Sequence, residues 1–260
     1  MKEFRDKVAV ITGAASGIGR GLAERCAQEG MKVVLADIEE EALAQAEKEL
    51  KTTGASVLAV LTDVSKAGDI ESLARKTLDT FGAIHLLFNN AGVGVFTNIW
   101  ESTVADWKWV IDVNLWGVIH AIRTFVPIML EQDTECHIIN TSSASGLISS
   151  PSLGVYKVTK HGVVSLSETL YHELAQRGAK VKVSVLCPGL VSTRVMDCER
   201  NRPVELQNDT NVEVSAESRA SEQAIRQSVS SGISPQEGAD CVFTAIRDVK
   251  FYMIKDSEKW

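Results

Sequence analysis

The sequence predicts a doubly wound α/β fold, in which one mainly parallel β-sheet carries helices on both faces. Short apolar runs alternate with longer segments of helical periodicity, such as residues 39–53 and 66–81. This alternation is typical of repeated strand–helix units with right-handed crossovers. The runs are almost continuously aliphatic and β-branched, as expected for strands that helices cover on both faces. Seven strands are predicted, at residues 8–12, 33–36, 56–60, 85–88, 137–140, 181–186 and 251–254.

Length and charge limit the possible classes of protein. The chain has 260 residues, 45% of them hydrophobic, and so can bury the core of one large domain. Its formal net charge of −7 does not suit a nucleic-acid-binding protein, which needs clustered Lys and Arg. The first apolar run follows several charged residues and is too short for a signal peptide or a membrane span. We therefore expect a single cytoplasmic domain over residues 1–260, with neither a membrane nor a nucleic-acid partner.

Cysteine and histidine spacing gives no metal site or disulfide framework. The five cysteines are odd in number and contain no CxxC pair, which favours reduced thiols. His161 and His172 could share a helix face, but they would be about 16 Å apart at the standard helical rise. No other grouping has the spacing of metal ligands, so no catalytic metal is expected.

Residues 194–234 interrupt the strand–helix alternation, because they are rich in polar and charged residues and poor in aliphatic ones. Such a composition buries little apolar surface, and a disordered loop is one interpretation. A weak helical pattern at 216–229 favours the other interpretation, a mobile helical flap over the substrate. A last helix should then begin after Ser234, because Pro235 and Glu237 have the spacing of an N1 proline and a capping-box carboxylate.

A glycine turn follows the first predicted strand. Gly13, Gly17 and Gly19 lie between that strand and a helix expected to begin near Ile18. Glycine permits a tight turn and a close approach of the backbone to a ligand, and a helix N-terminus offers free N–H groups to a pyrophosphate. An ordinary tight turn is the alternative for an isolated glycine pattern. The position directly after the first strand instead favours a Rossmann-type dinucleotide site.

Asp37 ends the second predicted strand, about twenty residues after the glycine turn. A carboxylate there can accept hydrogen bonds from both hydroxyls of the adenosine ribose, and it would repel a 2′-phosphate. Ala14 and Ala15 offer no basic group to pair with such a phosphate. Asp37 could also cap the helix that follows. The sequence thus predicts NAD rather than NADP as the cofactor.

Tyr156 and Lys160 are four residues apart in a predicted helix, so both side chains lie on one face of it. A solvated helix face is the usual origin of such a pair. Here Ser143, or the adjacent Ser142, stands at the end of the fifth strand, where open α/β sheets bind their ligands. A neighbouring ammonium lowers the pKa of a phenol, so Tyr156 is predicted to be a general acid–base group. A serine hydroxyl could hydrogen-bond the substrate oxygen.

Together these motifs resemble the classical short-chain dehydrogenase/reductase family. The similarity covers nearly the whole chain, through TGAASGIG at 12–19, NNAG at 89–92, Asn114, Ser143, YKVTK at 156–160 and PGLVST at 188–193. The resemblance implies an oxidoreductase that transfers a hydride between NAD and a secondary alcohol or ketone. It also implies that Ser143, rather than Ser142, is the catalytic serine.

The resemblance assigns further residues to the site. Asn114 would interrupt its helix to hold a water that links Lys160 to solvent, while Lys160 would also hold the nicotinamide ribose. Thr193 would hold the carboxamide. The expected catalytic residues are Asn114, Ser143, Tyr156 and Lys160. The expected cofactor-binding residues are Gly13, Ser16, Gly17, Ile18, Gly19, Asp37, Asp63, Val64, Asn90, Ala91, Gly92, Tyr156, Lys160, Pro188, Gly189, Val191 and Thr193.

Two other functions are compatible with these residues: an NADPH-dependent carbonyl reductase and a dinucleotide-binding regulator without catalysis. The substrate is expected to be a hydrophobic alcohol or ketone, because the predicted pocket walls are largely apolar. These walls are Val93, Gly94, Val95, Ser145, Leu147, Leu153, Leu190 and parts of the flap. Four tryptophans, Trp100, Trp107, Trp109 and Trp116, suit core or subunit packing better than substrate stacking.

The quaternary structure expected from the family resemblance is a homotetramer. The C-terminal sequence FYMIKDSEKW, however, lacks the glycine-rich tail that is usual in the family. A homodimer is therefore the alternative.

Overall fold

One sheet of seven parallel strands organises the residues that the computed structural model describes, 1–209 and 214–254. The strands are β1 (Val8–Thr12), β2 (Lys32–Asp37), β3 (Val57–Leu61), β4 (Leu86–Asn89), β5 (Cys136–Thr141), β6 (Val181–Leu186) and β7 (Tyr252–Met253). Their order is β3-β2-β1-β4-β5-β6-β7, and every pairing is parallel. The winding reverses between β1 and β4, the kind of point at which open α/β sheets bind ligands. The predicted doubly wound sheet is therefore confirmed.

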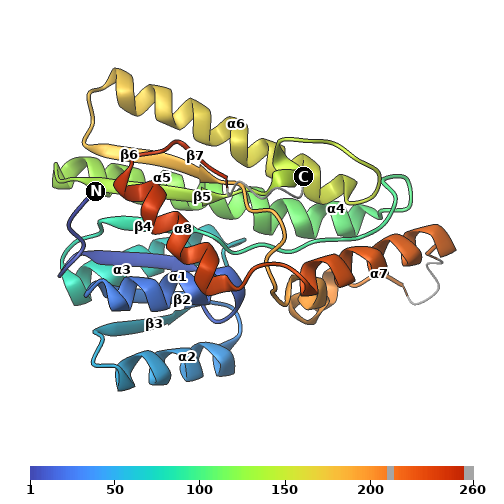
Figure 1. Cartoon of the computed structure of the whole chain (residues 1–260), viewed down its shortest axis with the longest axis horizontal. Helices are drawn as coiled ribbons and strands as arrows, with labels where there is room; N and C mark the ends of the chain where they lie inside the picture. The colour runs from blue at the N-terminus through green and yellow to red at the C-terminus, as the bar shows by residue number, and fades with distance from the viewer. Residues whose placement is uncertain (210–213, 255–260) are drawn as a thin grey trace.

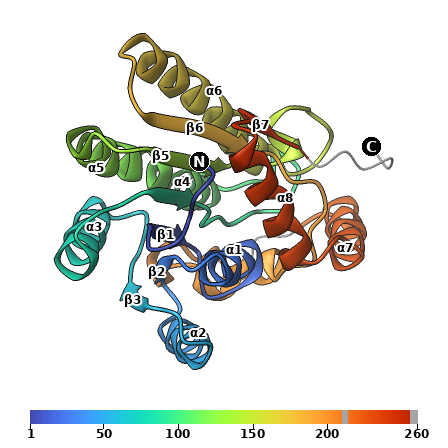
Figure 2. The ribbon, with the colours of Figure 1, turned by 60° about the vertical axis from the view of Figure 1, so that its left-hand side comes forward.

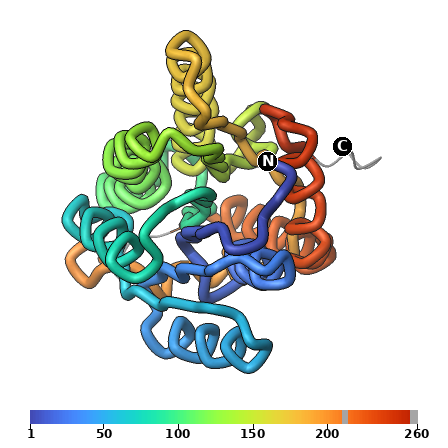
Figure 3. The backbone as a smooth tube through the Cα atoms, turned by 90° about the vertical axis from the view of Figure 1, so that its left-hand side faces the viewer, coloured from blue at the N-terminus to red at the C-terminus, as the bar shows by residue number. Residues whose placement is uncertain are grey.

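Helices cover both faces of this sheet (Figures 1 and 2). They are α1 (Gly17–Gln28), α2 (Glu40–Thr52), α3 (Ala67–Phe81), α4 (Val104–Ile111), α5 (Gly117–Gln132), α6 (Gly154–Gln176), α7 (Ala216–Ser230) and α8 (Pro235–Arg247). One core layer joins α1, α2 and α8 to the sheet, and a second joins α3, α5 and α6 to the opposite face. The tube in Figure 3 shows the same two layers. The helix α7 packs on neither face and lies beyond one end of the sheet (Figure 1).

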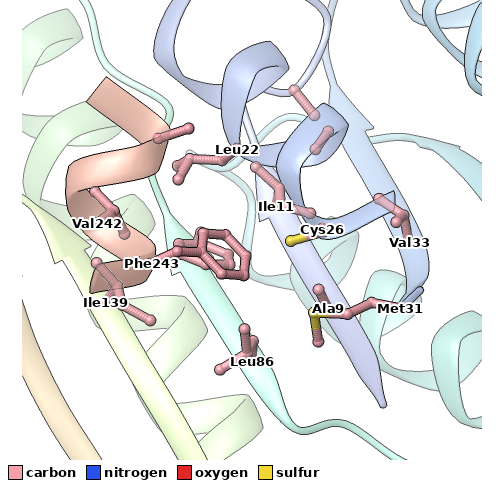
Figure 4. Close-up of a cluster of buried hydrophobic side chains, with 14 of the residues drawn as sticks. Ala9, Ile11, Leu22, Cys26, Met31, Val33, Leu86, Ile139, Val242 and Phe243 are labelled. Atoms are coloured by element: carbon pink, nitrogen blue, oxygen red, sulfur yellow. The ribbon is translucent and has the colours of Figure 1, made fainter. Parts of the chain in front are cut away.

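The first core layer shows how local sequence determines the packing of the last helix. Helix α8 begins as predicted, with a capping box between Ser234 and Glu237 and with Pro235 at its start. Its Phe243 is completely buried against β4 and the first strand (Figure 4). A Cβ atom at Gly21 would come within 2.6 Å of the Pro235 carbonyl oxygen, so glycine is required for α1 to pack this closely on α8. Burial of the Phe243 ring of α8 alone contributes about 2 kcal/mol to the stability of the fold.

A long apolar helical segment, residues Val104–Gln132, contributes to the second core layer. By length and composition this segment could cross a membrane. Its apolar character also has an explanation within the fold, because Phe125 and Met129 are completely buried in the core beneath the sheet. Core helices of this kind commonly contain long apolar stretches.

Burial of His137 on β5 predicts a loss of stability in acid. The imidazole is 1% exposed, and its Nε2 lies 2.7 Å from the Ser184 hydroxyl oxygen. The pKa of His137 is lowered to about 3, mainly by burial and in part by the positive charges of the N-terminal ammonium and Lys182. In the unfolded chain a histidine titrates near pH 6.5, so above that pH neutral His137 makes its full contribution to the free energy of unfolding. This contribution is lost as the pH falls towards 3, because the unfolded chain then binds a proton that the folded protein does not.

We expect the free energy of unfolding to fall by about 1.4 kcal/mol more per pH unit between pH 6 and 4 in the wild type than in a His137→Gln variant. Denaturant unfolding at several pH values measures this difference. His172→Gln, which changes an exposed histidine on α6, is the control and should retain the wild-type slope. Equal slopes for wild type and His137→Gln would contradict the assignment.

Candidate active site

A groove with a cavity of about 300 Å³ lies at the carboxyl ends of the strands. The sequence-predicted site residues that line it are Gly13, Ser16, Gly17, Ile18, Asp37, Asp63, Val64, Asn90, Ala91, Gly92, Ser143, Tyr156, Lys160, Pro188, Gly189, Val191 and Thr193. Gly19 and Asn114 are not part of this lining. Residues predicted from seven separate chain segments thus meet in one place.

The glycine turn after β1 has the backbone conformation that glycine favours. Gly13 and Gly17 have φ angles of +66° and +54°. A Cβ atom at Gly13 would come within 2.9 Å of the Ala91 Cα, and one at Gly19 within 2.0 Å of the Gly13 carbonyl oxygen. Gly19 therefore allows α1 to pack against the turn, and its contact with the cofactor stays a prediction.

The N-terminus of α1 faces this turn and suits a phosphate group. Among the described residues, the N-cap Ser16 makes no side-chain capping bond, and the first helical turn contains no acidic residue. The N–H groups at the start of a helix are free of intrahelical partners and carry a partial positive charge. Together with the close backbone approach at Gly13, they form a cradle that fits a pyrophosphate.

Asp37 is fixed at the edge of the groove by two backbone groups. The Ala15 N–H donates to Asp37 Oδ2 at 2.9 Å, and the Glu39 N–H donates to Oδ1 at 3.1 Å. Burial raises the pKa of this carboxyl, and the two hydrogen bonds oppose the rise. The N-cap of α2 is Glu39. Asp37 therefore does not cap this helix, but it accepts a hydrogen bond from the residue that does.

Ser143, Tyr156 and Lys160 come together at the other end of the groove. The Ser143 hydroxyl lies next to the Tyr156 phenol, and Lys160 Nζ lies 5.5 Å from the centre of the tyrosine ring. Lys160 Nζ also donates to the Thr141 carbonyl oxygen at 2.9 Å. The Ser142 hydroxyl donates to the Lys160 carbonyl oxygen at 2.8 Å. This bond gives Ser142 a structural role and leaves Ser143 as the serine next to the phenol.

The pKa shifts of Tyr156 and Lys160 differ from the sequence-based expectation. Burial raises the pKa of Tyr156, although the neighbouring Ser143 hydroxyl lowers it in part. Burial has the opposite effect on Lys160, whose pKa it lowers to about 8, because loss of water disfavours the charged ammonium. The predicted lowering of the phenol pKa by a nearby ammonium is thus not found in the protein alone, because loss of water around both groups opposes both charged forms.

Asn114 lies in a π-helical turn, Asp112–Trp116, between α4 and α5. Its Oδ1 accepts from the Val93 N–H at 2.8 Å, and its Nδ2 donates to the Val93 carbonyl oxygen and to the Thr159 hydroxyl. The predicted local interruption of the helix is therefore present. The side chain joins the segment after β4 to α6, and its water-holding role stays a prediction.

The substrate end of the groove is largely apolar, but its walls differ in part from those predicted. Val93, Ser145, Leu153 and Leu190 line it as expected. Gly94, Val95 and Leu147 do not line the groove, so this part of the predicted pocket wall was wrong. The flap contributes to the lining as expected, through Val195, Met196, Cys198, Ile225 and Val229. The apolar lining residues that the predicted walls did not include are Ile38, Phe96, Trp109 and Val113. Ile225 and Val229 are four residues apart on α7 and so lie on the same face of that helix. This spacing is a local sequence signal for an apolar face of the flap.

Comparison with known proteins identifies the family. A family model of short chain dehydrogenases matches residues 7–203. The chain belongs to the short-chain dehydrogenase family. The CLA biosynthesis dehydrogenase/reductase of Lactiplantibacillus plantarum is 34% identical to it, over 99% of this chain and 91% of its own length. The C alpha-dehydrogenase of a Sphingobium species is 35% identical, over 98% of this chain and 82% of its own.

A solved structure agrees with this assignment. A short-chain dehydrogenase/reductase from Burkholderia phymatum, crystallised in complex with NAD, has 47% sequence identity and a TM-score of 0.95. The comparison covers 98% of this chain and 90% of that one. This short-chain dehydrogenase is therefore an oxidoreductase that uses a nicotinamide cofactor.

A buried ion pair joins the 194–234 segment of this short-chain dehydrogenase to α4 beside the groove. Arg202 Nη2 lies 2.7 Å from Asp106 Oδ1, and both side chains are 3% exposed. The Arg202 guanidinium also lies 5.0 Å from the centre of the Trp109 ring, which lines the groove. Trp109 is thus buried in the core and also lines the groove, whereas Trp100 and Trp116 are exposed. A role of Trp109 in substrate stacking is not tested by this position.

Proposed function

We propose that this enzyme oxidises a hydrophobic secondary alcohol, or reduces the matching ketone, with NAD as the preferred cofactor. The observation that carries the proposal is the position of Ser143, Tyr156 and Lys160 in the same groove as the glycine turn. The apolar walls at that end favour a substrate without charge. Relatives that are named dehydrogenases and reductases support the reaction class.

The proposed cofactor contacts extend along the groove. Bound NAD would supply or accept the hydride. The cradle at Gly13 and Ser16 would hold the pyrophosphate, and Asp37 the adenosine ribose. Asp63 and Val64 would border the adenine. Asn90, Ala91 and Gly92 would support the middle of the cofactor, and Pro188, Gly189, Val191 and Thr193 its nicotinamide end.

The protein groups would then move one proton at the substrate oxygen. Tyr156 would accept it during oxidation and donate it during reduction, through its phenolic oxygen. Ser143 would hydrogen-bond the same substrate oxygen as charge develops on it. Because burial raises the pKa of Tyr156, a positive charge close to the phenol is needed to favour its ionised form. Lys160 would provide such a charge, and Asn114 would hold the water through which the proton reaches solvent.

A panel of secondary alcohols, assayed with NAD at alkaline pH, tests the reaction. Formation of reduced cofactor is followed by its absorbance. Apolar cyclic and aryl alcohols should be oxidised faster than charged or strongly polar ones of similar size. Preferential turnover of charged alcohols would contradict the substrate class, and binding of NAD without turnover of any alcohol or ketone would support the regulator instead.

Preference for NAD over NADP is expected because Asp37 would lie beside the 2′-position. The ratio of kcat/KM for the two cofactors measures this preference. Asp37→Ala should reduce the ratio by about tenfold, since it removes the charge that repels a 2′-phosphate. Equal or better use of NADP by the wild type would favour the NADPH-dependent carbonyl reductase.

We also propose that residues 194–234 close over the substrate and that the enzyme is a cytoplasmic homo-oligomer. The helix predicted near 216–229 is present as α7, and it contributes Ile225 and Val229 to the groove. Trp116 and, on α6, Val158 and Tyr171 are exposed. Exposed apolar side chains of this kind support a tetramer interface, with a dimer as the alternative.

A further inference from the structure

A carboxylate on the cofactor wall is paired with an arginine from the flap. Glu39 Oε1 accepts hydrogen bonds from Arg200 Nη2 and, at 3.0 Å, from Asn201 Nδ2. Glu39 comes directly before α2, and the other two residues lie in the helical turn η3 (Val195–Asn201). The pair therefore joins segments that are 161 residues apart in the chain.

The arginine of this pair is held in place on both sides. Arg200 Nη1 donates to the Asp197 carbonyl oxygen at 2.8 Å and to the Arg194 carbonyl oxygen at 3.3 Å. Its Nη2 is the group that meets Glu39. The hydrogen bond with Arg200 is the main cause of the lowered pKa of Glu39, so this carboxylate is ionised at neutral pH.

The pair lies at the ribose end of the groove. Asp37, Glu39, Arg200 and Asn201 all line it. The Glu39 N–H donates to the carboxylate of Asp37, which is the group proposed to meet the adenosine ribose. A guanidinium held by Glu39 is thus next to the place where NAD has a hydroxyl and NADP has a phosphate. Arginine is well suited to bind phosphate when its N–H groups are free.

We propose that Glu39 is a second determinant of the choice between NAD and NADP, because it occupies the arginine that would otherwise accept a 2′-phosphate. Asp37 repels the phosphate, and Glu39 withholds the cation that could compensate. This inference rests on the proposed use of NAD. It adds a specificity residue that the glycine turn and Asp37 do not reveal, because Arg200 reaches this wall only through the fold.

Direct binding of two half-cofactors tests the role of Glu39. Adenosine 5′-monophosphate represents the adenosine half of NAD, and adenosine 2′,5′-bisphosphate that of NADP. Calorimetry on the full-length protein gives both Kd values for the wild type, Glu39→Gln, Arg200→Met and the double variant. Thermal unfolding checks that each variant is folded, and kcat/KM with NAD and NADP gives a second measurement.

Glu39→Gln should improve the binding of the bisphosphate relative to the monophosphate by about tenfold, the effect of one additional charge-assisted contact of about 1.4 kcal/mol. The gain should disappear in Glu39→Gln/Arg200→Met. The control Glu40→Gln removes the neighbouring, exposed carboxylate and should change the ratio less than Glu39→Gln does.

Three results would overturn the inference: an unchanged ratio in Glu39→Gln, a gain that persists without Arg200, or an equal gain in Glu40→Gln. The last two results would indicate that the gain in bisphosphate binding comes only from the loss of a negative charge. Failure of the proposed function is distinguishable, because it would appear in the wild type as a lack of monophosphate binding or of NAD turnover.

Discussion

Replacement of Tyr156 by Phe is expected to lower turnover by a factor of about 10² to 10⁴ or more while NAD still binds. The substitution removes only the phenolic oxygen, which is the proposed site of proton transfer and the partner of Ser143. The ring keeps its packing in the wall of the groove. Steady-state kinetics with the best alcohol substrate measures turnover, and calorimetry measures cofactor affinity.

Two further variants on α6 make this result specific. Tyr171→Phe removes a phenol from an exposed position of the same helix and should leave turnover unchanged. Lys160→Met should lower both turnover and cofactor affinity, since the lysine is proposed to contact the nicotinamide ribose as well as to assist Tyr156. Near-normal turnover of Tyr156→Phe with full cofactor binding would disprove the Ser-Tyr-Lys assignment.

Replacement of Arg202 by Met should lower the free energy of unfolding by about 3–5 kcal/mol. The substitution leaves the Asp106 carboxylate buried without its cation, in a place where both side chains are 3% exposed. It also removes the hydrogen bond from Arg202 Nε to the Leu206 carbonyl oxygen at 2.6 Å and the contact with the Trp109 ring. Denaturant unfolding measures the loss, and the KM of a hydrophobic alcohol should rise because Trp109 loses its support.

Comparison with an exposed pair separates burial from simple charge loss. Arg226 on α7 pairs with Asp197, and the two side chains are 47% and 51% exposed. Arg226→Met should therefore cost less than about 1 kcal/mol. A double variant Arg202→Met/Asp106→Asn should recover part of the lost stability, because no unpaired charge is then buried. Equal losses for Arg202→Met and Arg226→Met would contradict this explanation.

Local physical rules in the sequence were sufficient for the architecture and for most of the groove. Short apolar runs predicted the seven strands, most of them aliphatic throughout because a strand covered on both faces has no polar side. The glycine turn and Asp37 follow the first two strands, and parallel strands bring their carboxyl ends to one edge. Tyr156 and Lys160 share a helix face through the helical repeat alone. These features depend on residues close together in the chain.

Tertiary structure decided what depends on packing and on exclusion of water. The chemistry of adjacent serines left Ser142 and Ser143 open, and only the family resemblance favoured Ser143. The bond from Ser142 to the Lys160 carbonyl oxygen, which depends on the fold, gives Ser142 a structural role. Burial reverses the expected direction for the phenol pKa of Tyr156, since desolvation is a property of the folded surroundings. The contact between Glu39 and Arg200 joins residues far apart in the chain, which no local periodicity can bring together.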